Sequence, residues 1–163
     1  MKSRTTAALA ATLLIGACSR SLATEVRPDG VLAALADPQA VELVALHPYP
    51  YQLEEADERP RFHGYGVLGR APLDDGGDRN RVLALVERGI EASNGMVAAC
   101  FSPRHGLRVE ADGSRWDLVV CFECLSMKVY RDGEQVDGHL TSEVVEPQVT
   151  ALFEASGLAI HGD

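Results

Sequence analysis

Apolar and polar positions along the chain follow two different periods, which predicts both strands and helices. Val82, Val86 and Ile90 recur at the 3.6-residue spacing of a buried helical stripe, and Asp75 before them is a good N-cap. Short apolar runs rich in β-branched residues instead predict strands. We expect five of them, at residues 41–46, 62–68, 97–109, 116–130 and 135–140.

Turn residues connect these elements in an order that indicates the fold class. Asp112-Gly113 lies between two apolar runs, which is a strong short-range signal for a hairpin. A last helix is expected to begin at Pro147 and to end at Gly157. The order of strands and helices predicts an α+β fold, in which an antiparallel, hairpin-rich sheet of about five strands has two helices packed on one face.

The N-terminal residues have the pattern of an exported protein. Lys2 and Arg4 precede an apolar run that is too short to span a bilayer, and small residues follow it, as in a secretory signal peptide. Residues 15–18 end in Cys18 and resemble the lipobox of bacterial lipoproteins. The resemblance implies cleavage before Cys18 and attachment of fatty acyl chains, such as palmitate, to that residue. Ser19 after it resembles the outer-membrane sorting signal of enteric bacteria.

These features divide the chain into a signal peptide (1–17), a lipidated N-terminus with a tether (18–38) and a single α+β domain (39–163). The chain has 163 residues, of which 46% are hydrophobic, which is enough for one core. We expect a domain held by its lipid in the bacterial cell envelope, at the outer membrane and facing the periplasm, with another envelope protein as partner. The net charge of −9 argues against nucleic acid, because phosphates require clustered Lys and Arg.

Three cysteines and one histidine lie close together in the predicted hairpin: Cys100, His105, Cys121 and Cys124. With Asp112-Gly113 as the two turn residues of a regular hairpin, Cys121 lies opposite Arg104. In that register Cys100 and Cys121 share one face, whereas His105 and Cys124 share the other, and each pair is about 13 Å apart. Pro103 favours a bulge, because proline cannot donate to a strand ladder. A bulge there sets Cys100 opposite Cys124, close to disulfide distance.

Four interpretations of this cluster remain open. A Cys100–Cys124 disulfide would leave Cys121 as a buried thiol, and the oxidising side of the membrane favours it. Cys100, His105, Cys121 and Cys124 would together form a zinc or copper site. The C-x-x-C pair would be a thiol-redox site. Finally, His105 would activate Cys100 or Cys121 as a nucleophile.

No complete catalytic set accompanies these residues in the sequence. We therefore expect a binding or structural role rather than a catalytic one. The alternative is a metal-binding or thiol-redox protein that uses the cysteine and histidine cluster.

The same segment carries a second resemblance. Cys-Phe-x-Pro-Arg-His from Cys100 and Cys-Phe-Glu-Cys from Cys121, on either side of an Asp-Gly turn, resemble a small family of bacterial proteins of unknown function. The segment 62–69 is similar to the upstream strand of that family. The resemblance covers about residues 41–131. It implies a unified domain in which the hairpin is important, and it implies no particular activity.

Overall fold

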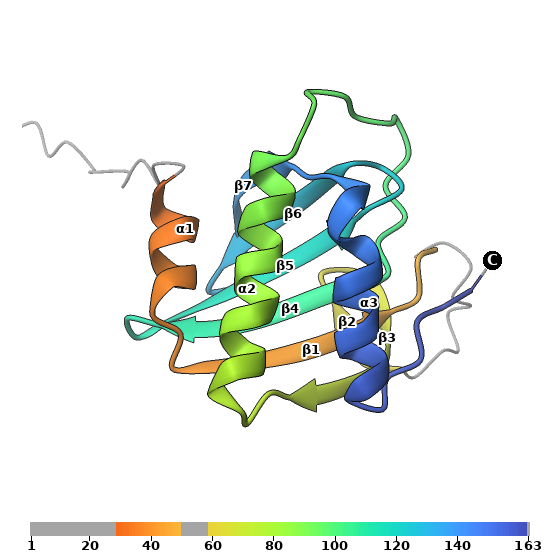
Figure 1. Ribbon diagram of the computed structural model, residues 1–163. Coiled ribbons are helices and arrows are strands. Elements are labelled where there is room, and N and C mark those ends of the chain that lie inside the picture. Colours follow the sequence, from red (N-terminus) through yellow and green to blue (C-terminus); the bar gives the residue numbers. More distant parts are fainter. Residues whose placement is uncertain (1–28, 50–58, 163) are drawn as a thin grey trace, which may run out of the picture.

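Seven strands and three α-helices make up residues 29–49 and 59–162, the part of the chain that the structure, a computed structural model, describes (Figure 1). The strands are β1 (Ala40–Leu46), β2 (Arg61–Phe62), β3 (Tyr65–Pro72), β4 (His105–Ala111), β5 (Ser114–Cys121), β6 (Ser126–Arg131) and β7 (Glu134–Leu140). The helices are α1 (Asp29–Ala36), α2 (Gly76–Glu91) and α3 (Glu146–Ala155), and the 3-10 turn η2 (Glu143–Val145) precedes α3. The strands form one antiparallel sheet in the order β2-β3-β1-β4-β5-β6-β7.

A mixed helix and strand fold with an antiparallel sheet is confirmed, but the sheet has seven strands instead of about five, and there are three α-helices instead of two. Two of the predicted strands are each divided by a turn. The first is broken at His63-Gly64, where φ is 50° and 90°. The second is broken at residues 122–125, where Leu125 has a φ of 54°. This second turn contains no glycine, proline or asparagine, so its composition does not indicate a turn.

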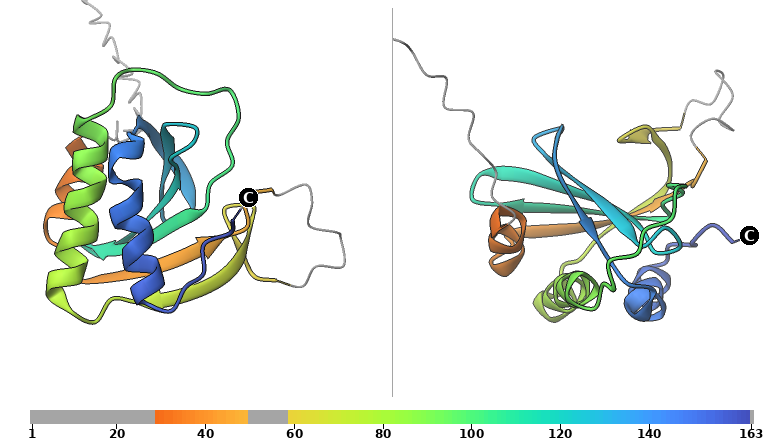
Figure 2. Two further views of the ribbon diagram at one scale, coloured as in Figure 1. Left: turned by 45° about the vertical axis from the view of Figure 1, so that its right-hand side comes forward. Right: turned by 90° about the horizontal axis from the view of Figure 1, so that it is seen from above.

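All three helices pack on one face of the sheet (Figure 2), and the main core lies between the helices and that face. Asp75 caps α2 as predicted, because its carboxylate accepts hydrogen bonds from the backbone N–H groups of Gly77 and Asp78. The α3 helix has a proline in its first turn, as expected. Buried side chains from alternating strand positions and from the helices fill the core, among them Leu43, Val82, Val86, Leu107, Val109, Leu118, Val129, Val149 and Phe153.

The third helix, α1, lies within residues 18–38, which the sequence analysis assigned to the tether. Val31 and Leu35 of this helix are buried in the main core, so α1 is packed as part of the domain. The signal peptide and Cys18 lie outside the described residues. Within the described ranges, none of the helices combines the length and the apolar character that crossing a membrane requires.

The opposite face of the sheet is covered at one end by the β2–β3 hairpin, which curls away from the helices (Figure 2). Phe62 and Tyr65 of this hairpin form a second, smaller core with Val44, Leu46 and Val119. This face, which we call the open face, contains the cysteines and the charged residues described next.

Candidate functional site

Three cysteines meet where β5 ends. Cys121 and Cys124 form a disulfide, and the Sγ atom of Cys100 lies 4.0 Å from the Sγ atom of Cys124. Cys121 lies two positions after Val119, so strand alternation directs its side chain to the open face. The structure therefore joins Cys124 to Cys121, whereas the sequence analysis expected Cys124 to pair with Cys100.

The difference from the expected pairing has a local cause. The β4–β5 hairpin has the predicted register, with His105 opposite Val120, but β4 begins at His105. Pro103 thus lies outside the strand, and no bulge forms there to set Cys100 into the ladder. After β5 the chain turns at residues 122–125, and the Leu125 N–H donates to the carbonyl of Phe122. This turn returns Cys124 to Cys121.

Cys100 belongs to the connection between α2 and β4, residues 92–104, which we call the 92–104 connection. The Ala98 N–H donates to the carbonyl of Cys124 at 3.1 Å, which ties this connection to the turn. Phe101 packs against Tyr65, whose hydroxyl donates to the Phe101 carbonyl, and the Lys128 ammonium lies 4.4 Å from the Phe101 ring centre. These contacts hold the residue after Cys100 on the open face.

Backbone donors point at both sulfur atoms of the disulfide. The Cys124 N–H donates to Cys121 Sγ at 3.2 Å, and the Ser102 N–H donates to Cys124 Sγ at 3.3 Å. An N–H group aimed at sulfur stabilises negative charge there when the bond opens. Either sulfur of the disulfide thus has a donor in place that would stabilise it as a thiolate.

The three cysteines differ sharply in exposure. Cys121 and Cys124 are only 1% and 0% exposed, whereas Cys100 is an exposed free cysteine. The site therefore consists of a buried disulfide in contact with one exposed thiol.

His105, the fourth residue of the predicted cluster, lies on the helix-covered face. Its ring contacts Phe122 and Phe153, and its Nε2 atom is 3.0 Å from Thr150 Oγ1 on α3. Burial, with a smaller contribution from the nearby charge of Arg104, lowers the pKa of His105 to about 4. The imidazole is therefore neutral at pH 7 and forms part of the packing between the sheet and α3.

This position removes His105 from the chemistry of the cysteines. The structure brings together Cys100, Cys121 and Cys124 and leaves His105 across the sheet, so the predicted Cys₃His set for zinc or copper is not assembled. In the described part of the chain no group of three or more His, Cys, Asp or Glu side chains is arranged to hold a metal ion. The same separation prevents His105 from activating Cys100 or Cys121.

A second cluster on the open face is centred on Asp117, which spacing across the hairpin places within reach of Arg108 and which the fold buries. Asp117 is 2% exposed, and both of its carboxylate oxygens accept hydrogen bonds from Arg108, at 2.8 and 3.0 Å. His63, 54 positions earlier, places Nε2 2.8 Å from the same carboxylate and stacks on Tyr130. Burial alone would raise the pKa of Asp117, but the hydrogen bonds and charges of His63 and Arg108 hold it below its usual value.

This cluster fixes the tip of the β2–β3 hairpin to the sheet. His63 occupies the turn between the two strands, so its contact with Asp117 fastens the hairpin over the open face. Tyr65 follows in the same hairpin and contacts Phe101, the neighbour of Cys100. The sequence analysis expected an unbroken strand through His63-Gly64, and nothing in the local sequence indicates where the tip of this hairpin docks.

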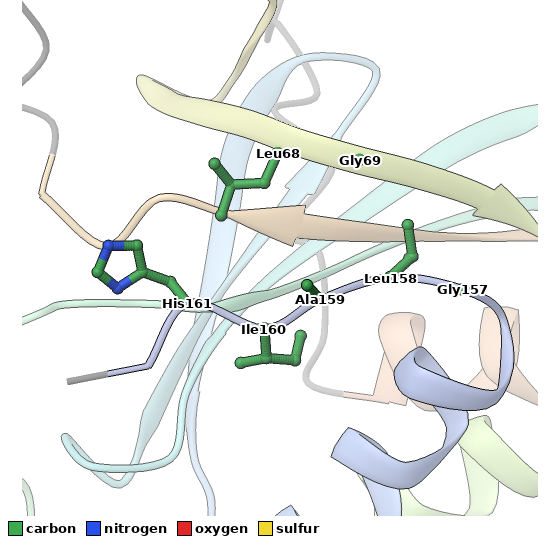
Figure 3. Close-up of a pocket in the computed structure, with 7 residues that line it drawn as sticks. All are labelled: Leu68, Gly69, Gly157, Leu158, Ala159, Ile160 and His161. Atoms are coloured by element: carbon green, nitrogen blue, oxygen red, sulfur yellow. The ribbon is translucent and has the colours of Figure 1, made fainter.

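A cavity of about 390 Å³ lies between β3 and the C-terminal segment (Figure 3). Leu68 and Gly69 line one side of it and residues 157–161 line the other. Arg104 connects this region to the disulfide turn, since its Nε donates to the carbonyl of His161 and its Nη1 lies 2.7 Å from Glu123 Oε1. Glu123 lies between the two disulfide cysteines in sequence, so Arg104 links the disulfide turn to the C-terminal segment.

The open face thus combines a buried disulfide, an exposed thiol and an ionic cluster that fastens the covering hairpin. No known protein family, curated protein or solved structure matches the chain, so these residues themselves are the basis on which a function can be assigned.

Proposed function

We propose that the chain is a lipid-anchored domain of the bacterial envelope that carries out thiol–disulfide exchange at Cys100, Cys121 and Cys124. The observation that carries the proposal is the 4.0 Å separation between Cys100 Sγ and Cys124 Sγ, the latter being half of a disulfide. Exchange requires a free cysteine next to a disulfide sulfur, and Cys100 lies in this position. An anchor at Cys18 on the periplasmic side of the outer membrane would hold the site in an oxidising compartment.

The exchange step is balanced within the chain. The Cys100 thiolate attacks Cys124 Sγ and forms a Cys100–Cys124 bond, while the Cys121–Cys124 bond breaks and its electron pair leaves on Cys121 Sγ. The proton lost by Cys100 is regained by Cys121, so no external oxidant is needed. The Cys124 N–H already points at Cys121 Sγ and would stabilise the leaving thiolate.

A structural disulfide in a binding domain is the competing function, and it is the role that the sequence favours. The presence of a third cysteine, Cys100, favours exchange over a purely structural disulfide. A disulfide that only stabilises the turn at residues 122–125 needs no exposed thiol in contact with it. Under oxidising conditions such a thiol would be oxidised or would exchange with the disulfide.

Disulfide mapping of the full-length protein tests the exchange. Free thiols are blocked with N-ethylmaleimide at low pH, and the linked peptides are identified by mass spectrometry without reduction. We expect both Cys121–Cys124 and Cys100–Cys124 linkages in the wild type. Cys121→Ser should contain Cys100–Cys124 alone, whereas the matched Cys100→Ser variant should retain Cys121–Cys124. If Cys121→Ser leaves both remaining thiols open to alkylation after mild oxidation, the proposed exchange does not occur.

The anchor is tested separately by fractionation. We expect wild-type protein to require detergent for extraction from membranes, because acyl chains on Cys18 hold it there. Cys18→Ala should appear in the soluble fraction without detergent. Cys100→Ser, the matched cysteine control, should remain with the membrane. Unchanged partition of Cys18→Ala would contradict the lipid anchor and leave the disulfide chemistry unaffected.

A further inference from the structure

We infer that Cys100 is a shuttle thiol through which the buried Cys121–Cys124 disulfide oxidises a pair of thiols in a partner protein, carried on an exposed, apolar segment of that partner. The inference rests on the proposed exchange at the same site and adds the substrate class and the route of the electrons.

The route follows from the difference in exposure. An external thiolate must approach a disulfide sulfur along the S–S axis, and the almost complete burial of Cys121 and Cys124 prevents this approach. Cys100 is the exposed member of the cluster and contacts Cys124 directly. Oxidising equivalents can therefore leave the buried disulfide by first passing to Cys100.

The 92–104 connection allows Cys100 to reach both Cys124 and a thiol of the partner protein. Residues 94–100 are all exposed, and the connection arches beyond the end of α2 before it returns to β4 (Figure 1). The described hydrogen bonds from this stretch to the rest of the domain are the one from the Ala98 N–H to the Cys124 carbonyl and the contact between Cys100 Sγ and Cys124 Sγ. From Phe101 onward the chain is held by packing against Tyr65 and Lys128. Because residues 94–100 have few buried contacts, their local stability is low. Cys100 can therefore move while the chain from Phe101 onward stays in place.

The chemistry of the partner follows from the residues next to Cys100. Met96 and Val97 are 61% and 59% exposed, the highest values among the exposed large hydrophobic side chains of the described residues. They precede the reactive thiol by four and three positions. Apolar side chains beside the thiol suit a polypeptide that contributes its own apolar side chains. A small anionic thiol such as glutathione would gain little from them and would be repelled by a chain with net charge −9.

The transfer conserves atoms and electrons. Once Cys100–Cys124 has formed, a partner thiolate attacks Cys100 Sγ, and Cys124 leaves as a thiolate that faces the Ser102 N–H. The second partner thiolate then attacks its neighbour's sulfur in the mixed disulfide and releases Cys100. The partner dithiol loses two electrons and two protons and becomes a disulfide. Cys121 and Cys124 gain them and become two thiols.

The test uses full-length Cys121→Ser protein in detergent, oxidised so that Cys100–Cys124 is its single disulfide, which is first verified by mapping. It is mixed with a synthetic peptide that has one cysteine flanked by leucines and valines, with a matched peptide flanked by serines and glycines, or with glutathione. A single-thiol probe stops at the mixed disulfide. Mass spectrometry after N-ethylmaleimide quenching gives the site and the initial rate of adduct formation.

We expect the adduct on Cys100 and an alkylated Cys124. The apolar peptide should react about tenfold faster than the polar peptide or glutathione, a ratio that corresponds to partial burial of two apolar side chains. The double variant Met96→Ser/Val97→Ser, made in the Cys121→Ser protein, should lose this preference. Leu68→Ser, which removes an exposed leucine on β3, should keep it.

The outcomes separate the inference from the proposed function. An adduct on Cys124, or equal rates for the three probes, overturns the shuttle inference while the verified Cys100–Cys124 disulfide leaves the exchange standing. Failure of Cys121→Ser to form that disulfide overturns the exchange and the shuttle together. As a final check, wild-type protein should convert a dithiol version of the apolar peptide to its disulfide, and Cys100→Ser should not.

Discussion

Replacing Asp117 with asparagine is expected to lower the free energy of unfolding at pH 7 by about 3 kcal/mol, the range for breaking a buried ion pair. The carboxylate is buried and accepts two hydrogen bonds from Arg108 and a contact from His63. Asparagine has one acceptor oxygen and no charge, so the guanidinium of Arg108 would lose one of its two hydrogen bonds and its ion pair. Urea unfolding followed by the fluorescence of Trp116, the single and buried tryptophan, measures the change.

Glu42→Gln provides a matched control on the same sheet face. Glu42 pairs with Arg70 at 2.6 Å, but the two side chains are 28% and 29% exposed, so the loss should stay below about 1 kcal/mol. An Asp117→Asn variant no less stable than Glu42→Gln would contradict the assigned role of the buried cluster.

The lowered pKa of Asp117 also sets the sign of its pH dependence. Its stabilising contribution is present above the pKa of an unfolded aspartate, about 4, and is lost as the pH falls through the lower folded value. Asp117→Asn should remove this part of the acid sensitivity.

The second large effect is expected from His105. Its pKa falls from 6.5 in the unfolded chain to about 4 in the fold, so between these values the unfolded state binds the extra proton. The free energy of unfolding should therefore fall by about 3 kcal/mol as the pH drops from above 6.5 to 4. Denaturant titrations at pH 7.5, 5.5 and 4.5 measure this slope.

His105→Gln isolates the contribution of the imidazole. Glutamine does not titrate and can still hydrogen-bond to Thr150, the partner of His105 on α3. Its slope over this pH interval should be smaller than that of the wild type by the His105 contribution. Parallel curves for the two proteins would show that His105 does not stay neutral in the fold.

The β4–β5 hairpin shows which features of the fold the local sequence pattern predicts correctly. Asp112-Gly113 and the alternation around it predicted the register of β4 and β5, and the structure has that register. Alternation also separated His105 from Cys121, as observed. These features depend on neighbours along the chain or directly across a two-residue turn, and such interactions can be inferred from spacing.

The turn at residues 122–125 marks where this reasoning failed. Residues 116–130 form a continuous apolar run, so the sequence predicted one strand and placed Cys124 on the face of His105. In the structure, Leu125 adopts a positive φ without a glycine, and the chain folds back. Packing of Phe122 into the main core and of Cys124 beneath the 92–104 connection accompanies this conformation, and neither contact has a local sequence signal.

The candidate site divides in the same way. The sequence by itself determined the Asp75 cap of α2, the hairpin register and the mixed class, because each follows from residue type and short spacing. The sequence also brought Cys100 close to Cys124, but tertiary structure alone decided that Cys124 bonds to Cys121, that His105 packs against α3 and that His63 reaches Asp117 across 54 positions. Those contacts depend on how the sheet curls and on where long connections return, which are set by the packing of the whole chain and not by any local pattern.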